Sequence, residues 1–265
     1  MVEFNQKDTY GIDDLIEIVG LLRSENGCPW DREQTHKTIK SDFIEEVCEA
    51  IEAIDLEDAD LLREELGDVL LQVIFHCSIE MDAGTFTFGD VCDEVCKKLI
   101  VRHPHVFGDT VVSSTDDVLK NWDSIKKATK GQETYTDTLK SVAKSLPALM
   151  RAQKVGKRAM RANMDFSELK DVVSAMEAEK LELDEAISSG DSERIFDELG
   201  DLLFSCVNIA RHLGIDAEQA LTHSTDKFIS RFEKTEELVN FDSYDMKELT
   251  IEQLDEYWKR AKKML

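Results

Sequence analysis

The stretch "EELGDVLLQ" at residues 64–72 returns as "DELGDLLFS" at residues 197–205, an offset of 133 residues. In both copies an acid, a glycine and a second acid interrupt an apolar run. A glycine inside a helix costs about 1 kcal/mol relative to alanine, and a carboxylate on a core-facing stripe needs a partner for its charge. The repeated pattern therefore indicates a site at which something compensates for both costs.

The rest of the chain also has helical spacing. Apolar residues recur at three- and four-residue steps, and only 3 prolines and 12 glycines interrupt them. Turn signals such as "NGCPWD" and "SSGDS" separate the periodic segments. We therefore expect an all-α protein. Its predicted helices lie near 12–25, 39–55, 59–82, 88–102, 115–129, 145–162, 166–188, 192–213, 217–238 and 250–264.

Several motifs occur twice in the same order, which indicates a tandem duplication. The duplicated elements are Glu46 and Glu49 with Glu179 and Glu182, Glu65 and Asp68 with Glu198 and Asp201, "KLIVR" (98–102) with "KFISR" (227–231), and "NWDSIK" (121–126) with "YWKRAK" (257–262). The least patterned stretch follows the first copy. We expect an N-terminal domain at 1–130, a linker at 131–144 and a C-terminal domain at 145–265.

The charge of the chain limits its partners. It has 32 basic and 56 acidic residues, a net charge of −24. Such a surface repels phosphates, so we expect no nucleic-acid partner and no anionic membrane surface. The N-terminus does not resemble a signal peptide, and the longest apolar run is too short for a bilayer. We expect a cytoplasmic protein.

The six cysteines form no CxxC pair. In a reducing compartment we expect them to be free and to pack as small buried hydrophobes. Cys92 and Cys96 share a helix face, so a zinc or redox role is an alternative for this pair.

Glu46 and Glu49 lie on one helix face because they are three residues apart, and the same holds for Glu65 and Asp68. One such pair means little in a chain this acidic. However, the separation between the two pairs is the same in both halves, and it suits two antiparallel helices joined by a short turn. We therefore expect four carboxylates to converge in each half. Converging carboxylates either take up protons or bind hard cations.

Ligands that are all oxygen favour Mg²⁺, Mn²⁺ or Ca²⁺ over zinc or copper. A di-iron bundle would need Glu-x-x-His on two helices, and the only instance, Glu33 to His36, is not repeated. Gly67 and Gly200 lie within the acidic motifs. We expect the missing side chain to let a neighbouring helix or a hydrated metal ion approach the backbone.

Basic and aromatic residues follow the acids in both halves, each pair four residues apart on one helix face. They are Lys98 and Arg102, Trp122 and Lys126, Lys227 and Arg231, and Trp258 and Lys262. Basic groups beside a carboxylate–Mg²⁺ cluster suit a polyphosphate, whose charge the metal ions and side chains share.

The combined pattern EExxE, fifteen residues, ExxD, KxxxR and WxxxK, with "GCPWDREQTH" (27–36) and "RHPHVFGD" (102–109), resembles the MazG family of nucleoside triphosphate pyrophosphohydrolases over nearly the whole chain. The resemblance implies two tandem MazG-like helical-bundle domains, with four-helix-type cores formed on homodimerisation. It also implies hydrolysis of (d)NTPs to (d)NMP and pyrophosphate, dependent on Mg²⁺, for which Mn²⁺ would substitute.

The resemblance also implies the site residues. The metal ligands would be Glu46, Glu49, Glu65 and Asp68 in the first half, and Glu179, Glu182, Glu198 and Asp201 in the second. The basic and tryptophan residues named above would hold phosphates and base. Glu45, Glu46, Glu49, Glu179 and Glu182 would be catalytic, with Glu45 taking a proton from the attacking water. Ala178 stands where the first half has Glu45. The C-terminal half is usually credited with activity in two-domain relatives, and Ala178 puts that assignment in question.

Other functions have less support. No GxxxxGK[ST] P-loop or GxSxG elbow occurs in the sequence. The remaining alternatives are a non-catalytic acidic helical adaptor and a divalent-ion-binding protein. Trp30, Asp31 and His36 either line a first-half pocket or anchor a turn. His103 and His105 are expected to end a helix rather than to bind metal.

Overall fold

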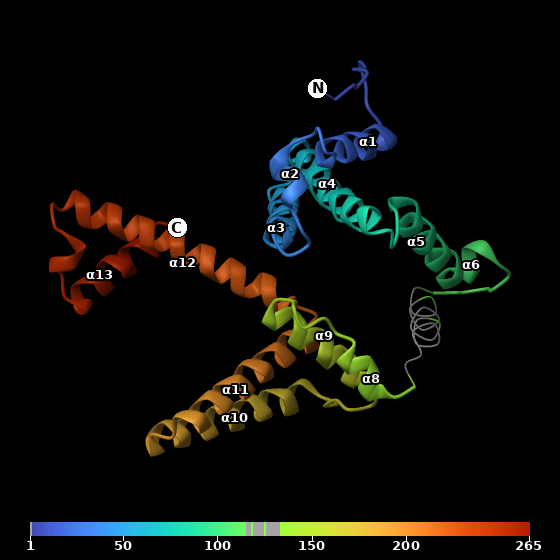
Figure 1. The fold of residues 1–265 in the computed structure, drawn as a ribbon. Helices are drawn as coiled ribbons and strands as arrows, with labels where there is room; N and C mark the ends of the chain where they lie inside the picture. Colours follow the sequence, from blue (N-terminus) through green and yellow to red (C-terminus); the bar gives the residue numbers. More distant parts are fainter. Residues whose placement is uncertain (1, 115–117, 119–124, 126–132) are drawn as a thin grey trace. The chain divides into compact units, whose positions relative to one another are not determined.

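The structure is a computed structural model that describes residues 2–114, 118, 125 and 133–265. All regular secondary structure in these residues is helical, which confirms the expected fold class (Figure 1). The helices are α1 (Ile12–Arg23), α2 (Pro29–Glu33), α3 (Lys40–Asp55), α4 (Ala59–Ala83), α5 (Phe88–Arg102), α6 (Pro104–Phe107), α8 (Tyr135–Lys140), α9 (Ala148–Met160), α10 (Leu169–Ser189), α11 (Ser192–His212), α12 (Ala217–Phe241), η1 (Met246–Glu248) and α13 (Ile251–Ala261). The helix expected at 115–129 lies outside the described residues, apart from two positions.

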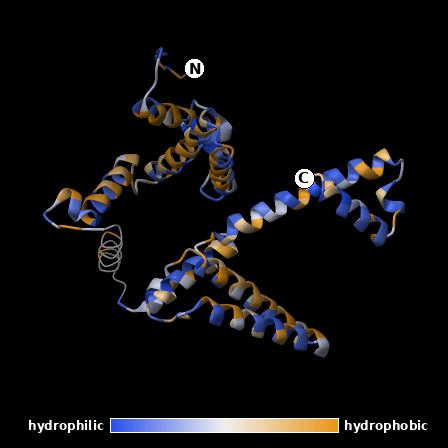
Figure 2. Ribbon diagram, turned by 180° about the vertical axis from the view of Figure 1, so that it is seen from behind, coloured by the Kyte–Doolittle hydropathy of each residue, from blue (hydrophilic) through white to orange (hydrophobic). Residues whose placement is uncertain are grey.

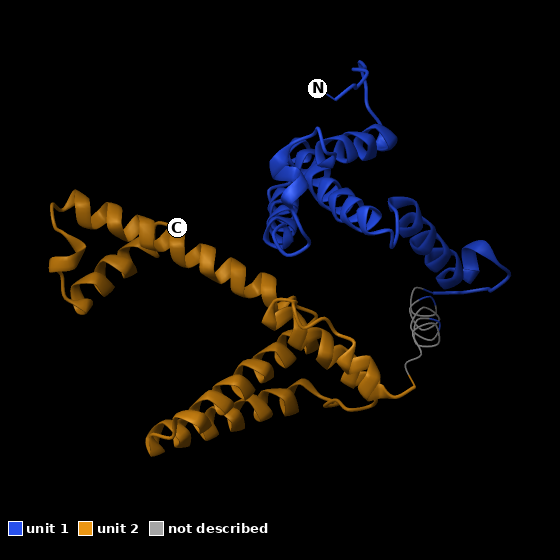
Figure 3. Cartoon of the chain, in the orientation of Figure 1, with its two compact units in different colours: residues 1–125 blue, residues 126–265 orange. Residues whose placement is uncertain are grey.

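The chain divides into two units, residues 1–125 and residues 126–265 (Figure 3). The stretch 131–144, which we expected to link the domains, contains α8. Arg158 of α9 donates a hydrogen bond to the Ser141 hydroxyl at 2.7 Å, just beyond the end of α8. The second unit therefore includes residues before 145.

An antiparallel helix pair carries the acidic motifs in each unit, α3–α4 in unit 1 and α10–α11 in unit 2. Asp58 caps α4, and its carboxylate accepts hydrogen bonds from two backbone N–H groups of the first turn. Asp191 caps α11 in the same way. Gly190, with φ of +71°, ends α10 in a left-handed conformation that glycine adopts without strain. These short turns set the register in which the acidic motifs of adjacent helices face each other.

The core of unit 1 is a cluster formed by Val19, Ile39, Ile74 and Phe75. It packs α1 and the start of α3 against the C-terminal half of α4. Unit 2 buries small aliphatic residues in the same manner, among them Val172, Val207 and Val239. In unit 1 this core contacts the C-terminal half of α4, whereas the acidic motif of α4 lies in its N-terminal half.

Large apolar side chains remain exposed on both helix pairs. Figure 2 shows where hydrophobic residues lie along these helices. They include Ile44, Val47, Ile51, Ile54, Leu66 and Leu70 in unit 1, and Leu181, Ile187, Phe196, Leu199 and Leu203 in unit 2. Exposed apolar faces of this extent mark interaction surfaces.

The cysteine prediction was wrong at three positions. Cys77 is buried, but Cys48, Cys96 and Cys206 are exposed. They lie on α3, α5 and α11, on helix faces that no other described element of the chain covers.

None of the described helices has the length and apolar character that crossing a bilayer requires.

Candidate active site

The carboxylates of unit 1 converge as the spacing predicts. Glu46 and Glu49 from α3 and Glu65 from α4 place ligand oxygens within 4.8 Å of one another. Glu46 and Glu65 are half-buried, and Glu49 is exposed. The helix pair thus holds three negative charges closer together than water alone would favour.

The pKa values of these carboxyl groups show that holding their negative charges close together is unfavourable. The pKa of Glu46 is raised, first by partial burial and then by repulsion from Asp68 and Glu49. The pKa of Glu65 is raised by desolvation and by Glu49. Asp68 is half-buried and acts on Glu46, although its oxygens are not part of the tight group. All four predicted acids of unit 1 therefore interact.

Unit 2 repeats the arrangement. Glu179 and Glu182 from α10 and Glu198 from α11 place their oxygens within 4.8 Å of one another. The pKa of Glu179 is raised by burial first, then by Asp201, Glu182 and Glu198. One difference is Arg194, whose guanidinium lies 3.4 Å from Glu198, whereas unit 1 has Leu61 at the corresponding position.

The residues present fit a hard divalent cation. The donors are all carboxylate oxygens, three of them within 4.8 Å of one another, and a fourth acid lies near enough to repel them. A bound cation would remove this repulsion, and Mg²⁺, Mn²⁺ and Ca²⁺ prefer such oxygen ligands.

Mg²⁺ is expected to stabilise the protein at neutral pH. The pKa values of Glu46 and Glu179 are raised on folding, so their contribution to stability is present below the unfolded value of 4.5 and is lost as pH rises through the raised values. A cation that binds the ionised clusters offsets this loss. We expect saturating Mg²⁺ to raise Tm by about 5 °C at pH 7.5 and to have little effect near pH 4. Differential scanning calorimetry measures both; no shift at pH 7.5 would contradict the metal assignment.

The basic residues predicted to hold the phosphates in unit 2 do not lie on the α10–α11 pair that carries the acids. Lys227 and Arg231 are on α12, and Trp258 on α13 packs against Phe228 with ring centroids 5.0 Å apart. The α12–α13 hairpin diverges from the α10–α11 pair (Figures 1 and 2). Among the described residues no ion pair joins Lys227 or Arg231 to the acids of unit 2. Lys262, the C-cap of α13, is exposed.

In unit 1, Lys98 is exposed and Arg102 is half-buried, both on α5. Trp122 and Lys126 lie outside the described residues. The structure thus brings the acids of each unit together, and it groups Lys227, Arg231 and Trp258 on one hairpin. It does not bring the acids and the basic residues together within one described unit.

We expected a neighbouring helix or a hydrated metal ion to approach the backbone at Gly67 and Gly200. For helices of this chain, that expectation was wrong. Apart from the adjacent residues and the nearby backbone of the same helix, no atom of the described chain lies within 4 Å of the position that a Cβ would take at either residue. Both glycines lie on helix faces without a neighbour. The space beside them is open to another molecule.

A histidine pair is the main feature that sequence reasoning left undecided. His36 Nδ1 lies 2.7 Å from His76 Nδ1, and His36 Nε2 lies 2.6 Å from Glu80. Burial lowers the pKa of His76, with a further contribution from His36. These contacts attach the segment before α3 to α4, so they position α3; Trp30 is 60% exposed and lines no core. The helical period of α4 predicts which helix face carries His76. It does not predict the contact with His36, which lies in a different segment of the chain.

His103 is the C-cap of α5, and the short helix α6 follows it, so the expected helix end is confirmed.

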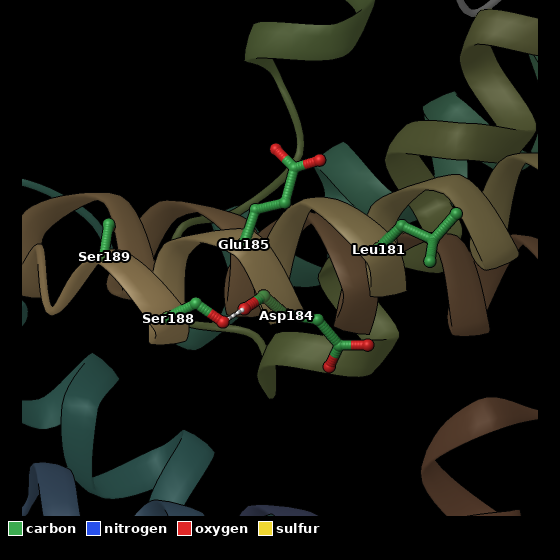
Figure 4. Close-up of a pocket in the computed structure, with 5 residues that line it drawn as sticks. All are labelled: Leu181, Asp184, Glu185, Ser188 and Ser189. Carbon is green, nitrogen blue, oxygen red and sulfur yellow. Dashed lines mark hydrogen bonds between the residues drawn. The ribbon is translucent and has the colours of Figure 1, made fainter.

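Figure 4 shows a pocket of about 560 Å³ lined by residues of α10 alone. Asp184 and Glu185 extend in different directions there, and the Ser188 hydroxyl donates a hydrogen bond to the backbone carbonyl of Asp184 at 2.8 Å. Its acids do not converge, in contrast to the adjacent cluster.

Comparison with known proteins places this geometry in a family. The model of the MazG nucleotide pyrophosphohydrolase domain matches the chain twice, at residues 34–107 and 168–235. Each match contains one helix pair and its cluster. The nucleoside triphosphate pyrophosphohydrolase/pyrophosphatase MazG of Thermotoga maritima is 44% identical over 250 residues, which cover 94% of this chain and 95% of that protein.

A second relative gives the same result. The nucleoside triphosphate pyrophosphohydrolase of Escherichia coli K12 is 41% identical over 258 residues, 95% of this chain and 97% of that protein. YabN of Bacillus subtilis, which is uncharacterized, is 42% identical over 246 residues, 92% of this chain but 50% of its own length. Both helix pairs, both carboxylate clusters and the full-length similarity agree: the chain belongs to the MazG nucleotide pyrophosphohydrolase family.

Proposed function

We propose that the protein is a Mg²⁺-dependent nucleoside triphosphate pyrophosphohydrolase, which hydrolyses (d)NTPs to (d)NMP and pyrophosphate. The observation that carries the proposal is the duplicated carboxylate cluster, in which three oxygens lie within 4.8 Å in each unit. Relatives that match nearly the whole chain carry this activity in their names. The role of each residue below is part of the proposal.

The proposed ligands are Glu46, Glu49, Glu65 and Asp68 in unit 1, and Glu179, Glu182, Glu198 and Asp201 in unit 2. When bound, Mg²⁺ supplies charge neutralisation and polarisation at the phosphoryl oxygens, and Mn²⁺ would substitute. Water attacks the α-phosphorus, and the bond from that phosphorus to the bridging oxygen of the pyrophosphate breaks. Glu45 accepts the proton of the water in unit 1. Ala178 leaves unit 2 without this carboxylate.

We also propose a homodimer. The exposed apolar faces of α3–α4 and α10–α11 suit coverage by a second copy, which would complete four-helix cores. The α12–α13 hairpin diverges from its own α10–α11 pair, so it can carry Lys227 and Arg231 toward the acids of the other copy. There the two cations would neutralise the leaving pyrophosphate. The net charge of −24 argues against a nucleic-acid partner, and a cytoplasmic location stays a prediction.

Product analysis tests the reaction. Purified protein with Mg²⁺ should convert ATP or dTTP to the monophosphate and pyrophosphate, which ion-exchange chromatography separates. Hydrolysis in ¹⁸O-labelled water should place the label in the monophosphate, because the water attacks the α-phosphorus. Release of orthophosphate and nucleoside diphosphate would reject the proposal.

A further inference from the structure

Unit 2 contains a cavity of about 580 Å³. Part of its wall comes from α11, the helix that carries two of the proposed metal ligands. Its walls come from α8, α9, the loop between α9 and α10, and α11. Its apolar lining consists of Leu139, Val155, Ala159, Met164, Phe166 and Phe204. The volume falls in the range of small-molecule sites, about 300–1,000 Å³. The proposed reaction gives no role to the residues that line this cavity.

The polar wall of the cavity carries no free charge. Arg211 donates two hydrogen bonds to Asp165, at 2.8 and 2.5 Å, and a third from Nε to the Asn208 side-chain oxygen at 3.1 Å. The side chains of Arg211 and Asp165 are 5% and 16% exposed. Because each charge is already paired, the cavity suits a neutral group better than a phosphate.

Asn208 presents a hydrogen-bond donor to the cavity. Its side-chain oxygen accepts from Arg211, which fixes the orientation of the amide. Among the described residues its NH₂ group has no protein partner, and the residue lines the cavity. Phe166 and Phe204 are 44% and 40% exposed beside it. The site thus combines aromatic faces with a donor that is free to bind an acceptor atom.

The position of the cavity relates it to the carboxylate cluster. Phe204 and Asn208 follow Asp201 by three and seven residues on α11, so all three share one face of the helix. At 1.5 Å per residue they lie about 4.5 and about 10.5 Å farther along the helix axis. A nucleotide with its phosphates at the cluster would extend its base over about this distance.

We propose that the cavity, rather than Trp258, binds the nucleobase of the substrate, with Phe166 and Phe204 as stacking surfaces and the Asn208 amide as a donor to the base; Trp258 packs against Phe228 on the α12–α13 hairpin. This inference rests on the proposed function. Base–aromatic stacking tolerates every base, and each base carries acceptor atoms on its edges, so one amide donor serves purines and pyrimidines. Asn208 contacts the base and not the reacting atoms, so it acts in substrate binding.

Unit 1 does not repeat the polar wall. The residue that corresponds to Asn208 at the offset of 133 is Phe75, which is 6% exposed and belongs to the core. The guanidinium of Arg23 lies 5.1 Å from its ring centroid. The proposal therefore assigns this mode of base binding to unit 2 and leaves unit 1 without the Asn208 donor.

The test uses the full chain with Glu49→Gln, which removes the contribution of unit 1. Asn208→Ala removes the donor, and Ala159→Phe fills the cavity. Asn240→Ala, at an exposed position of α12, is the matched control. We measure kcat and KM for ATP, GTP, CTP and dTTP, together with the inhibition constant of inorganic tripolyphosphate, which has phosphates but no base.

Asn208→Ala should raise KM for the nucleotides about tenfold, with kcat and the tripolyphosphate inhibition constant within about twofold of the parent. Ala159→Phe should raise KM more for purines than for pyrimidines. Unchanged nucleotide KM values in both variants would overturn the proposal. An equal rise in the tripolyphosphate constant would also overturn it, because the variants would then act on the phosphate site or the fold.

The proposed function can fail separately. If the wild-type chain hydrolyses no nucleotide, the proposed function is wrong; if only the Glu49→Gln parent is inactive, unit 2 alone lacks activity. In both cases calorimetric titration still tests the cavity. Mg–ATP should then bind more tightly than Mg–tripolyphosphate to the parent, and Asn208→Ala should abolish the difference. Equal affinities in the parent, or a preference that survives in the variant, would reject base binding in the cavity.

Discussion

A chain that carries both Glu49→Gln and Glu182→Gln is expected to lose about a thousandfold in Mg²⁺-dependent nucleotide hydrolysis. Glutamine keeps the size of the side chain but removes one of three converging negative charges in each unit. Metal ions contribute several kcal/mol to such reactions, and each 1.36 kcal/mol is a factor of ten in rate. Each single variant should remove only the share of its own unit. Steady-state rates against Mg²⁺ concentration measure both effects.

The chain offers matched controls for these variants. Glu52 lies three residues after Glu49 on α3, and Asp184 lies two residues after Glu182 on α10; both are exposed and neither belongs to a carboxylate cluster. Glu52→Gln and Asp184→Asn should leave the rate within about twofold, because they alter only exposed charges. If the double variant hydrolyses nucleotides as fast as the wild type, the clusters are not the catalytic centre. The adaptor and ion-binding alternatives would then be favoured.

The pattern of the acids was predictable from sequence because it depends only on local rules. Two residues three apart share a helix face, and a short turn between two helices makes them antiparallel, so Glu49 and Glu65 must approach each other. The long helices follow for the same reason, and α3, α4, α10 and α11 lie within a few residues of their predicted bounds. Helices α2, α6 and α8 were missed, because four to six residues are too few to show a helical period.

Features that join distant segments were not predictable. Arg211 and Asp165 are 46 residues apart and lie on a helix and a loop, with no duplicate in the first half to indicate their contact. The exposure of Cys48 and Cys206 also depends on what covers a helix face, which periodicity does not specify. Apolar spacing tells which face needs a partner. It does not tell whether that partner is the same chain or a second copy, and the described residues leave apolar side chains exposed on both helix pairs.

Asp165→Asn is expected to lower the free energy of unfolding of unit 2 by about 2 to 4 kcal/mol at pH 7. Arg211 is the main cause that lowers the pKa of Asp165 from 3.8 to about 2. A pKa depressed in the folded state gives stability that is fully present above the unfolded value and is lost as pH falls through the folded one. The variant also leaves a buried arginine without its counter-charge. Urea unfolding of the full chain, followed by circular dichroism, measures the difference.

The pH dependence separates this ion pair from a simple packing effect. His212 Nε2 also lies 3.0 Å from the Asp165 carboxylate, so the gap between wild type and Asp165→Asn is compared at pH 7 and below pH 4. It should narrow below pH 4, where the wild-type carboxylate takes up its proton. Asp184→Asn is the control, because its partner Lys180 lies at 2.6 Å but both side chains are more than half exposed. Such a pair contributes at most about 1 kcal/mol. A gap for Asp165→Asn that is equally small at pH 7 would show that the Arg211 pair does not hold the α9–α10 loop against α11.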